Sequence, residues 1–245
     1  IGSRGSKERS DTGLFVAEGM QLLREALSSQ RGPGIETLYL SPAGLLRIAE
    51  LDTSEVNVVE VSDAVMQAMA STVTPQGILM VCSVPANSLA DLAMTEDSFV
   101  IYLDRIQDPG NAGTILRSAD AFGARAVITS PGSVDMYSPK VVRSTAGSLW
   151  HIPVFESLEF REVLPQLGNP ECIVLSSHAS ESIVNFRATR PCIAIFGNEG
   201  AGTSREQLAI NARTVAIPMS GQAESLNLSA AASVVMFTLS QPSRG

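Results

Sequence analysis

The chain has 245 residues, of which 44% are hydrophobic, and its 17 basic and 25 acidic residues give a formal net charge of −8. The length allows one large domain or two small ones, and the composition excludes both a disordered chain, which combines low hydrophobicity with high net charge, and a generally basic nucleic-acid coat protein. Nucleic acid stays open as a ligand, because affinity depends on where the cations lie rather than on their sum.

The first part of the chain predicts a small unit of alternating helices and strands. The polar, basic stretch up to Gly13, with Lys7 and Arg9, predicts a mobile arm. Apolar spacing and breaker residues then predict a helix from Glu18, a strand over 37–40, a helix over 43–51, a strand over 56–61, a short helix capped by Ser62 and a strand over 78–84. The stretch 86–97, which contains Asn, Ser and acidic residues, predicts a linker and leaves 1–85 as a first domain.

A second domain over 98–245 repeats the alternation more strongly. The pattern predicts strands over 99–103, 126–129, 172–176, 192–196 and 214–217, and helices over 111–122, 158–167, 205–210 and 228–239. Thr203 and Glu206 have the spacing of a capping box. Strands that alternate with helices predict an α/β fold with parallel sheets covered on both faces.

The cysteines argue against a metal-binding protein, and the uncharged stretches argue against a membrane protein. Cys82, Cys172 and Cys192 are far apart and only two histidines accompany them, so no metal site is predicted. Their sparse, odd number is typical of the reducing cytoplasm, where we expect the protein. The stretches 64–90 and 225–243 are interrupted by proline, glycine or polar residues, and neither they nor the N-terminus predict a membrane span or a signal peptide.

Three polar segments of the second domain each follow a predicted strand. In the first, a Pro-Gly-Asn turn places Asn111 at the carboxyl end of a strand, where open α/β sheets bind ligands. Arg117 lies on the polar face of the next helix, where a surface ion pair with Asp120 is the alternative to a functional role. The second segment, 195–204, ends in a glycine-rich turn, which lets backbone N–H groups approach a ligand closely, although an ordinary strand-to-helix loop would look the same. It has neither the P-loop nor the dinucleotide-binding pattern.

The third polar segment, 215–229, runs from a strand through Pro218 and Gly221 to Asn227 and Ser229, which open a helix of small residues. Helix capping explains one of these polar side chains but not all of them. Small residues let a helix pack closely against another chain, although a buried helix is the commoner case.

Together and in this order, the three segments resemble the sequence motifs of the SpoU family, the ribose 2′-O-methyltransferases of the SPOUT superfamily. The resemblance covers the second half of the chain, including 137–144 and 225–229, and extends more loosely to 14–19 and 74–77. It implies a catalytic α/β domain with a deep trefoil knot, a rare exception to unknotted chains. It also implies a small N-terminal α/β domain that binds RNA and resembles a ribosomal protein.

The resemblance also implies a site. S-adenosylmethionine would be the methyl donor, with no metal, and the protein would be a homodimer whose active site is completed across the interface. Matched by position, the catalytic residues are Arg117, Asn111, Glu199, Ser225 and Asn227, the cofactor-binding residues are Gly197, Ile217, Met219 and Leu226, and the RNA-binding residues are Lys140, Arg143, Arg9 and Lys7. Because a guanidinium keeps its proton, we expect Arg117 to stabilise the developing alkoxide or to hold a phosphate, rather than to act as a base.

The implied activity is methylation of a ribose 2′-hydroxyl in RNA. Ribosomal RNA of the 23S type is the favoured substrate, because the minimal transfer-RNA enzymes lack an additional RNA-binding domain. The alternatives are a transfer-RNA methyltransferase, a ribosomal enzyme that confers antibiotic resistance, and a catalytically silent RNA-binding or ribosome assembly factor on the same scaffold. A classical Rossmann-type methyltransferase is disfavoured, because its glycine-rich loop would follow the first strand.

Overall fold

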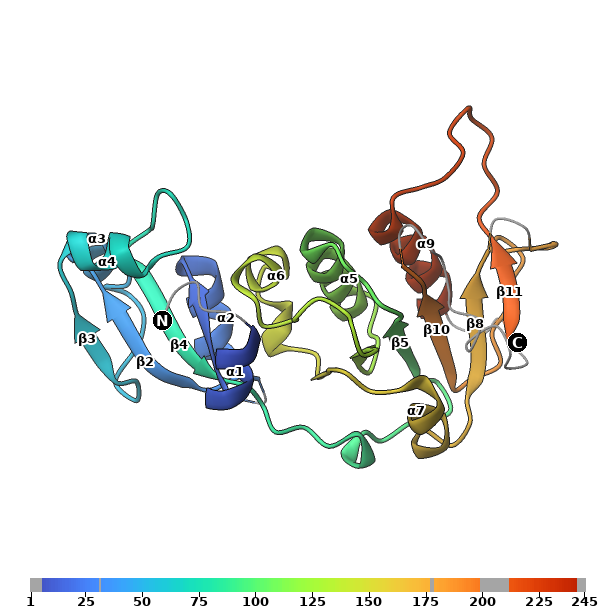
Figure 1. Cartoon of the computed structure of the whole chain (residues 1–245), viewed down its shortest axis with the longest axis horizontal. Coiled ribbons are helices and arrows are strands. Elements are labelled where there is room, and N and C mark those ends of the chain that lie inside the picture. The colour runs from blue at the N-terminus through green and yellow to red at the C-terminus, as the bar shows by residue number, and fades with distance from the viewer. Residues whose placement is uncertain (1–5, 31, 177–178, 199–211, 242–245) are drawn as a thin grey trace. The chain divides into compact units, whose positions relative to one another are not determined.

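The computed structural model describes residues 6–30, 32–176, 179–198 and 212–241, and the chain divides into two compact units (Figure 1). Unit 1 comprises Ile1–Ala86 and Asp135–His151, and unit 2 comprises Asn87–Val134 and Ile152–Gly245. The chain therefore enters unit 2, returns to unit 1 and enters unit 2 again. The helix predicted over 205–210, with its capping residues Thr203 and Glu206, lies outside the described residues.

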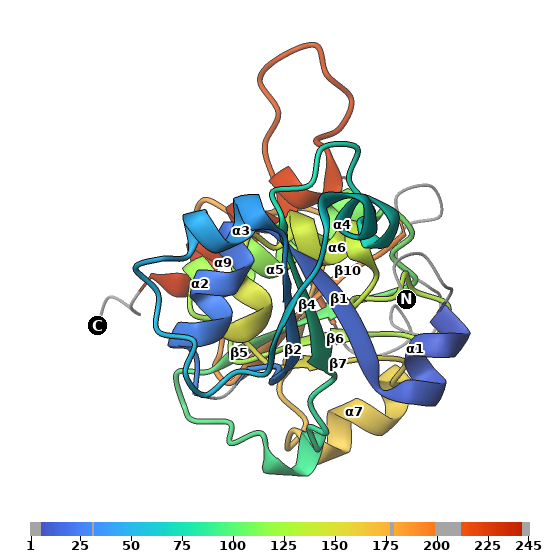
Figure 2. The same cartoon turned by 90° about the vertical axis from the view of Figure 1, so that its left-hand side faces the viewer.

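The sheet of unit 1 is mixed, so the prediction of parallel sheets is wrong for this unit. Its strands are β1 (Leu14–Glu18), β2 (Ile35–Leu40), β3 (Val58–Glu60) and β4 (Ile78–Ser83), in the spatial order β1-β4-β2-β3. Figure 2 shows β4 between β1 and β2, and it runs antiparallel to both, whereas β2 and β3 are parallel. The alternation of helices and strands along the chain does not determine which strands become neighbours in the sheet. In this unit β4 lies between β1 and β2, and the sheet is therefore mixed.

The N-terminal residues form a helix and a strand instead of an arm. The helices of unit 1 are α1 (Ser6–Thr12), α2 (Met20–Ser28), α3 (Pro42–Arg47), α4 (Asp63–Met69) and α6 (Pro139–Ser144), with a 3-10 turn, η2, at Ser148–Trp150. Arg9 on α1 binds Asp135 through Nε and Nη2, at 2.7 and 2.6 Å from Oδ2. The mobile arm is therefore a wrong prediction for residues 6–12. Ser62 caps α4 as predicted, since its Oγ accepts from the N–H of Val65 at 3.3 Å.

The segment Asp135–His151 supplies aromatic side chains to the core of unit 1. The Trp150 side chain is almost wholly buried, and its indole Nε1 donates to the carbonyl of Pro33 at 2.9 Å. The ring of Phe15 on β1 lies 6.2 Å from that of Trp150 and 5.0 Å from that of Tyr137, centroid to centroid. Large aromatic side chains dominate core energetics, so this segment is part of the fold of unit 1.

Unit 2 contains the predicted parallel sheet. Its strands are β5 (Phe99–Leu103), β6 (Val127–Thr129), β7 (Val154–Phe155), β8 (Glu171–Leu175), β9 (Glu181–Ser182), β10 (Cys192–Phe196) and β11 (Arg213–Ala216), in the order β7-β6-β5-β10-β8-β11-β9. Every described pairing between them is parallel, and the two central strands, β5 and β10, are buried along their whole length. Strands buried on both faces are typical of parallel sheets.

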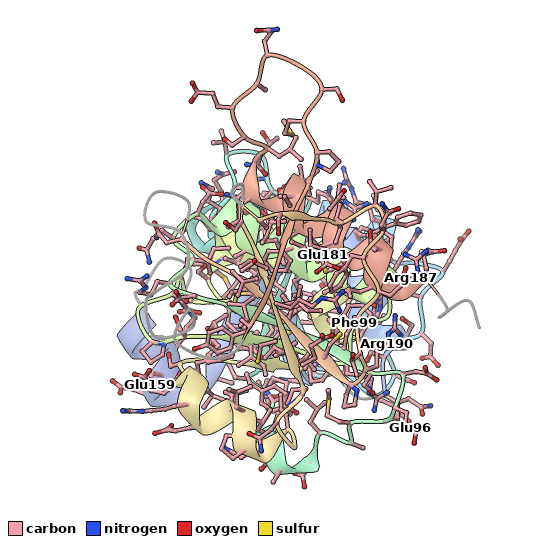
Figure 3. The ribbon with its side chains drawn as sticks, turned by 90° about the vertical axis from the view of Figure 1, so that its right-hand side faces the viewer. Glu96, Phe99, Glu159, Glu181, Arg187 and Arg190 are labelled. Carbon is pink, nitrogen blue, oxygen red and sulfur yellow. The ribbon has the colours of Figure 1, made fainter. Side chains whose placement is uncertain are left out.

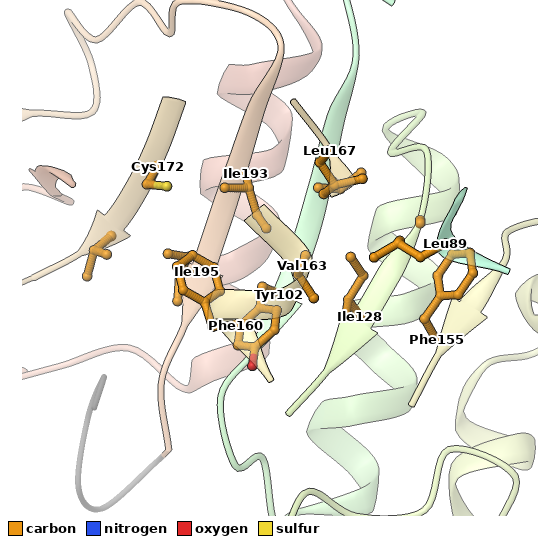
Figure 4. Close-up of a cluster of buried hydrophobic side chains, with 13 residues drawn as sticks. Leu89, Tyr102, Ile128, Phe155, Phe160, Val163, Leu167, Cys172, Ile193 and Ile195 are labelled. Atoms are coloured by element: carbon orange, nitrogen blue, oxygen red, sulfur yellow. The ribbon is translucent and has the colours of Figure 1, made fainter. Parts of the chain in front are cut away.

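Helices cover this sheet. They are η1 (Leu89–Asp91), α5 (Pro109–Ala121), α7 (Phe160–Gln166) and α9 (Leu228–Ser240). On one side, Phe160 of α7 meets the ring of Tyr102 edge to face, with 4.8 Å between the ring centroids (Figure 4). Leu89 of η1 is buried in the same cluster, so unit 2 begins within the stretch predicted as a linker. On the other side, α5 and α9 pack against each other, and α9 also contacts β10. No described helix is long and apolar enough to cross a membrane.

Candidate functional site

The three polar segments begin at one edge of the parallel sheet. They follow β5, β10 and β11, whose carboxyl ends point the same way because all three strands are parallel to their neighbours. Ligands of open α/β sheets bind outside the carboxyl ends of the strands. This edge of unit 2 is therefore the candidate site.

Asn111 is held in the first turn of α5. Asp108 is the N-cap of the helix, and its Oδ1 accepts from the N–H of Asn111 at 2.7 Å. Pro109 occupies the first helical position, where its missing N–H costs no hydrogen bond. The Asp-Pro-Gly-Asn sequence therefore starts the helix and fixes the backbone of Asn111 in its first turn.

The side chain of Asn227, at the start of α9, contacts that of Asn111, at the start of α5. Its Nδ2 donates to Oδ1 of Asn111 at 3.0 Å, and its Oδ1 caps α9 by accepting from the N–H and the hydroxyl of Ser229 at 2.9 and 2.6 Å. A further bond, 2.8 Å between the hydroxyls of Ser118 and Ser233, joins the same two helices. The structure thus brings together two predicted catalytic residues that are 116 positions apart in the sequence.

Arg117 is an exposed residue of α5. In the part of the chain that the structure describes, its guanidinium forms no ion pair or hydrogen bond, so the alternative ion pair with Asp120 is not formed. A guanidinium on a rigid helix with no protein partner keeps all five of its N–H donors for a ligand. This arrangement suits an oxyanion or a phosphate.

The loop after β5 is tied to the loop after β10. Asn198 Nδ2 donates to the carbonyl of Arg105 at 2.9 Å, and the N–H of Arg105 donates to Oγ of Ser130 at 2.7 Å. Arg105 adopts a φ of 54°, a left-handed conformation that is costly for a residue with a Cβ. Its side chain lies against the buried carboxylate of Asp104, with 3.2 Å between Nε and Oδ1. Sequence reasoning missed Arg105 and Asn198 as loop anchors, although both stand inside the polar segments.

The residues predicted to hold the cofactor lie on two of these loops. Gly197 directly follows β10, and Ile217, Met219, Ser225 and Leu226 lie in the loop from β11 to α9, which projects from unit 2 in Figure 1. Met219 and Leu226 are each 40% exposed, which is high for large apolar side chains. Among the described residues, the backbone of 218–226 forms no hydrogen bond. Free backbone donors and acceptors beside apolar side chains are what a small-molecule site requires. Glu199 lies outside the described residues.

The predicted RNA-binding cations belong to unit 1. Lys140 and Arg143 are exposed on α6, and Arg143 Nη1 donates to Oγ of Ser71 at 2.6 Å. Arg9 is instead held against Asp135, and both side chains are mostly buried. The side chain of Lys7 lies outside the described part of the structure.

Arg213 and Arg190 of unit 2 serve the fold, and Figure 3 labels Arg190 together with Phe99 and Glu181, residues that the two arginines contact. Arg213 binds Glu181, with 2.8 Å between Nε and Oε2, and lies 4.5 Å from the ring centroid of Phe186. This hydrogen bond lowers the pKa of Glu181 below its ordinary value. Arg190 Nη1 donates to the carbonyl of Asp97 at 2.8 Å, and its guanidinium lies over the ring of Phe99. These partners distinguish Arg190 and Arg213 from Arg117.

The cysteines offer no nucleophile and no metal centre. All three are buried, and burial raises the pKa of Cys82 and Cys192 to about 12 and that of Cys172 to about 11. A thiol with so high a pKa carries almost no thiolate, which is the reactive form. Within the described ranges, no group of three or more His, Cys, Asp or Glu side chains could hold a metal ion.

Two protein-family models match this chain. The model described as the SpoU rRNA Methylase family matches residues 98–237, and the model described as the MRM3-like substrate binding domain matches residues 3–80. The first match covers more than half of the chain and contains all three polar segments. The second covers the helices and strands of unit 1 from α1 to the first half of β4.

Individual proteins resemble this chain over nearly its whole length. The 23S rRNA (guanosine(2553)-2′-O)-methyltransferase RlmP of Bacillus subtilis is 34% identical over 239 residues, which cover 95% of this chain and 91% of that protein. The 23S rRNA (uridine(2479)-2′-O)-methyltransferase of Streptomyces viridochromogenes is 31% identical over 97% of this chain and 85% of that protein. The crystal structure of the SpoU methyltransferase AviRb from Streptomyces viridochromogenes in complex with AdoMet matches with a TM-score of 0.86 at 26% identity, covering 97% of this chain and 93% of that chain. The similarity therefore extends over both units.

Proposed function

This chain belongs to the SpoU rRNA methylase family, and we propose that it methylates a ribose 2′-hydroxyl of 23S-type ribosomal RNA with S-adenosylmethionine as the methyl donor. The observation that carries the proposal is the contact of Asn227 with Asn111 on α5, the helix that also presents Arg117, whose guanidinium has no partner among the described residues. The ribosomal substrate is supported by the match of unit 1 to a substrate binding domain and by relatives that methylate 23S rRNA and match both units.

The loops of unit 2 fit S-adenosylmethionine. Gly197 has no side chain to block an approach to the end of β10. The loop with Ile217, Met219 and Leu226 offers apolar surface for an adenine ring and backbone groups that no described residue binds. When bound, S-adenosylmethionine supplies a methyl group on a positively charged sulfur. The chain's own task is to hold it and the ribose in the right orientation, which can provide a large part of the rate.

Arg117 favours the reaction electrostatically. The ribose 2′-oxygen gains negative charge as its proton passes to solvent, and a fixed guanidinium stabilises that charge as the oxygen forms its bond to the methyl carbon. Asn111 and Asn227 orient the ribose and the groups around Arg117, because their side chains are fixed to each other and to two helix starts. Glu199 and Ser225, matched to the family's motifs, complete the proposed polar set. Lys140 and Arg143 of unit 1 bind phosphates of the RNA.

The proposal extends to the architecture of the family. It includes a deep trefoil knot in the catalytic domain within 98–245, and a substrate domain built mainly from 1–85 and joined to it by the stretch 86–97, whose η1 packs on unit 2. It also includes a homodimer formed through α9, on which Val234 and Phe237 are 37% and 55% exposed. Exposed apolar side chains on a helix of small residues suit a protein interface. Because ribosomes are assembled in the cytoplasm, we place the enzyme there.

A methyl-transfer assay tests the activity. The purified protein is incubated with S-adenosylmethionine carrying a labelled methyl group and with in vitro transcribed 23S rRNA, 16S rRNA or a transfer-RNA pool. We expect label in 23S rRNA, and nuclease digestion should yield a 2′-O-methylated dinucleotide, because 2′-O-methylation blocks cleavage at that position. Label only in transfer RNA would overturn the ribosomal assignment. Binding of the transcript without any transfer would support the silent assembly factor instead.

A thermal-shift measurement tests cofactor binding separately. A ligand that binds only the folded state raises the melting temperature by mass action. We expect S-adenosylmethionine to raise it, and adenosine alone to raise it less. Light scattering of wild type and of Val234→Asp tests the dimer, which the charged side chain should dissociate if α9 forms the interface.

A further inference from the structure

Unit 1 holds a loop that is anchored at both ends. The loop Ser71–Gln76 connects α4 to β4, and both the N–H and the hydroxyl of Ser71 donate to Oε1 of Glu18, at 2.8 and 2.6 Å. Thr72 Oγ1 donates to the other oxygen of the same carboxylate at 2.9 Å. At the far end, Oε1 of Gln76 accepts from the N–H of Met20 at 2.9 Å. Both ends of the loop are therefore tied to the start of α2 and the end of β1.

The residue after the loop is a glycine because nothing larger fits. Gly77 has a φ of +80°, and a Cβ there would lie 2.5 Å from Oγ of Ser41 and 2.7 Å from the backbone nitrogen of Gly44. The carbonyl of Gly77 accepts from the N–H of Ser41 at 3.0 Å. This close backbone contact fixes where the loop enters β4 and explains the Thr-Pro-Gln-Gly sequence at that point.

The tip of this anchored loop presents an apolar side chain to solvent. Val73 is 92% exposed, and its carbonyl accepts from Nε2 of Gln67 at 3.2 Å. Ordering a loop costs conformational entropy, and a valine that stays in water returns no burial energy for it. Val73 therefore presents an apolar surface at a fixed position, where it is available for contact with another molecule.

The loop is joined directly to the cations of α6. Ser71 Oγ, which donates to Glu18, also accepts from Nη1 of Arg143 at 2.6 Å. Arg143 is exposed, so its other guanidinium N–H groups can bind a phosphate bidentately. Lys140 lies three residues earlier, on the same side of α6, and is also exposed. The loop and the helix therefore form one surface that combines positive charge with an apolar tip.

The carboxylate beneath this surface stays ionised. Partial burial raises the pKa of Glu18, but the hydrogen bonds from Ser71 and Thr72 outweigh it, and the pKa of this carboxyl lies below its ordinary value. An ionised Glu18 is a strong acceptor for both loop hydroxyls. It also favours the orientation in which Ser71 donates to Glu18 and accepts from Arg143.

We propose that the loop Ser71–Gln76 and α6 form one RNA-contact surface, on which Val73 packs against an unstacked nucleobase while Arg143 and Lys140 bind the flanking phosphates. Ser71 is a positioning residue, because it acts through Arg143. This inference rests on the proposed function, in that the RNA is the substrate of the same enzyme. Proteins recognise single-stranded RNA through contact with exposed base faces together with backbone charge neutralisation.

Direct binding measurements test this surface with matched controls. The dissociation constant for a 23S rRNA transcript is measured by filter binding over a range of salt concentrations. Val73→Ser is compared with Val184→Ser, another exposed valine, which belongs to unit 2, and Arg143→Gln is compared with Arg24→Gln, an exposed arginine on α2. We expect Val73→Ser to weaken binding about fivefold and Arg143→Gln about tenfold with a salt slope smaller by about one. Both controls should bind as wild type.

Ser71 provides a test of positioning. Ser71→Ala should weaken RNA binding about threefold and reduce the salt slope, and Ser71→Thr, which keeps the hydroxyl, should restore both. Melting temperatures identify any variant that fails to fold. Equal RNA affinity of Val73→Ser and Val184→Ser would overturn the proposal even if the protein methylates RNA. Because binding is measured without turnover, absence of methyl transfer in wild type would count against the proposed function and leave this surface to be decided by the affinities.

Discussion

Arg9 in unit 1 and Arg117 in unit 2 are both arginines on helices, and they serve opposite purposes. The Arg9 side chain is 16% exposed and binds Asp135 through two nitrogens. Arg117 is exposed, and among the described residues it has no partner. A paired, half-enclosed cation stabilises the fold, whereas an unpaired cation on a rigid helix is available to a ligand. Residue type and local sequence do not distinguish the two, and three-dimensional pairing does.

The largest expected effect is on catalysis by Arg117. Arg117→Ala removes the guanidinium that stabilises the developing oxyanion and should lower kcat by about 100- to 1000-fold. Melting temperature and the thermal shift by S-adenosylmethionine should stay close to wild type, because no described hydrogen bond is lost. Single-turnover methyl transfer to 23S rRNA measures the effect.

Arg117→Lys is the matched variant for this comparison. It keeps the charge but lacks the planar fork of donors, so we expect its rate to lie between those of Ala and wild type. Near-normal turnover of Arg117→Ala would contradict the assignment. It would leave the family's catalytic arginine without a function in this chain.

For Arg9 we expect a loss of stability with little change in the rate of methyl transfer. Arg9→Ala leaves the mostly buried Asp135 carboxylate without its cation and should reduce the free energy of unfolding by about 2 kcal/mol. Urea unfolding measures it, and the rate of methyl transfer per folded molecule should stay within about twofold of wild type.

A double-mutant cycle sharpens this test. If the pair is structural, the loss of stability in the double variant Arg9→Ala/Asp135→Ala should be smaller than the sum of the losses in the two single variants. Each single variant leaves one charge without its partner, whereas the double variant removes both charges. Additive losses would show that the two side chains are not coupled in the fold, and a specific loss of RNA affinity in Arg9→Ala would show that Arg9 acts on RNA as the sequence predicted.

Asn227 both caps α9, which stabilises the fold, and contacts Asn111 in the candidate site, and two substitutions separate these roles. Asn227→Ser keeps a good N-cap for α9 but loses the donor to Asn111, so kcat should fall about tenfold with little change in melting temperature. Asn227→Ala loses the cap as well and should cost a further ~1 kcal/mol of stability. Equal melting temperatures for the two variants would show that the cap contributes nothing. Unchanged kcat in Asn227→Ser would remove Asn227 from the site.

The sequence predicted unit 2 well because its signals are local. The strands over 99–103 and 192–196 match β5 and β10 residue for residue, since each is a short apolar run, bounded in the first case by polar residues and in the second by proline and glycine. The Asp-Pro-Gly-Asn start of α5 and the Asn227 cap of α9 are also local signals, and parallel strands then bring them to one edge. The contact of Asn111 with Asn227 follows from this topology, although the sequence shows no sign that the two side chains bind each other.

Unit 1 was predicted less well because its first helix and strand are held in place by residues far away in the sequence. α1 is held by Arg9 and Asp135, and β1 by the rings of Phe15 and Trp150, which are more than 100 residues apart in each case. No local pattern shows that Asp135–His151 belongs to unit 1. One practical consequence is that deleting residues 1–85 would remove the partners of Tyr137 and Trp150. Point substitutions therefore test RNA selectivity more cleanly than truncation does.

The smallest expected effect is the pH-dependent contribution of Glu18 to the stability of unit 1. The pKa of Glu18 is raised by partial burial but lowered more by hydrogen bonds from Ser71 and Thr72, so it lies below its unfolded value. Its stabilisation is therefore present above the unfolded pKa and is lost as the pH falls through the folded pKa. Glu18→Gln should cost about 0.5 kcal/mol at pH 7, since the site is partly solvated, and this cost should shrink below about pH 4.5. Urea unfolding at pH 7 and pH 4 measures it, with the exposed Glu60→Gln as control. A cost independent of pH would mean that Glu18 orders the loop by shape, and that its charge has no part in holding Ser71 for Arg143.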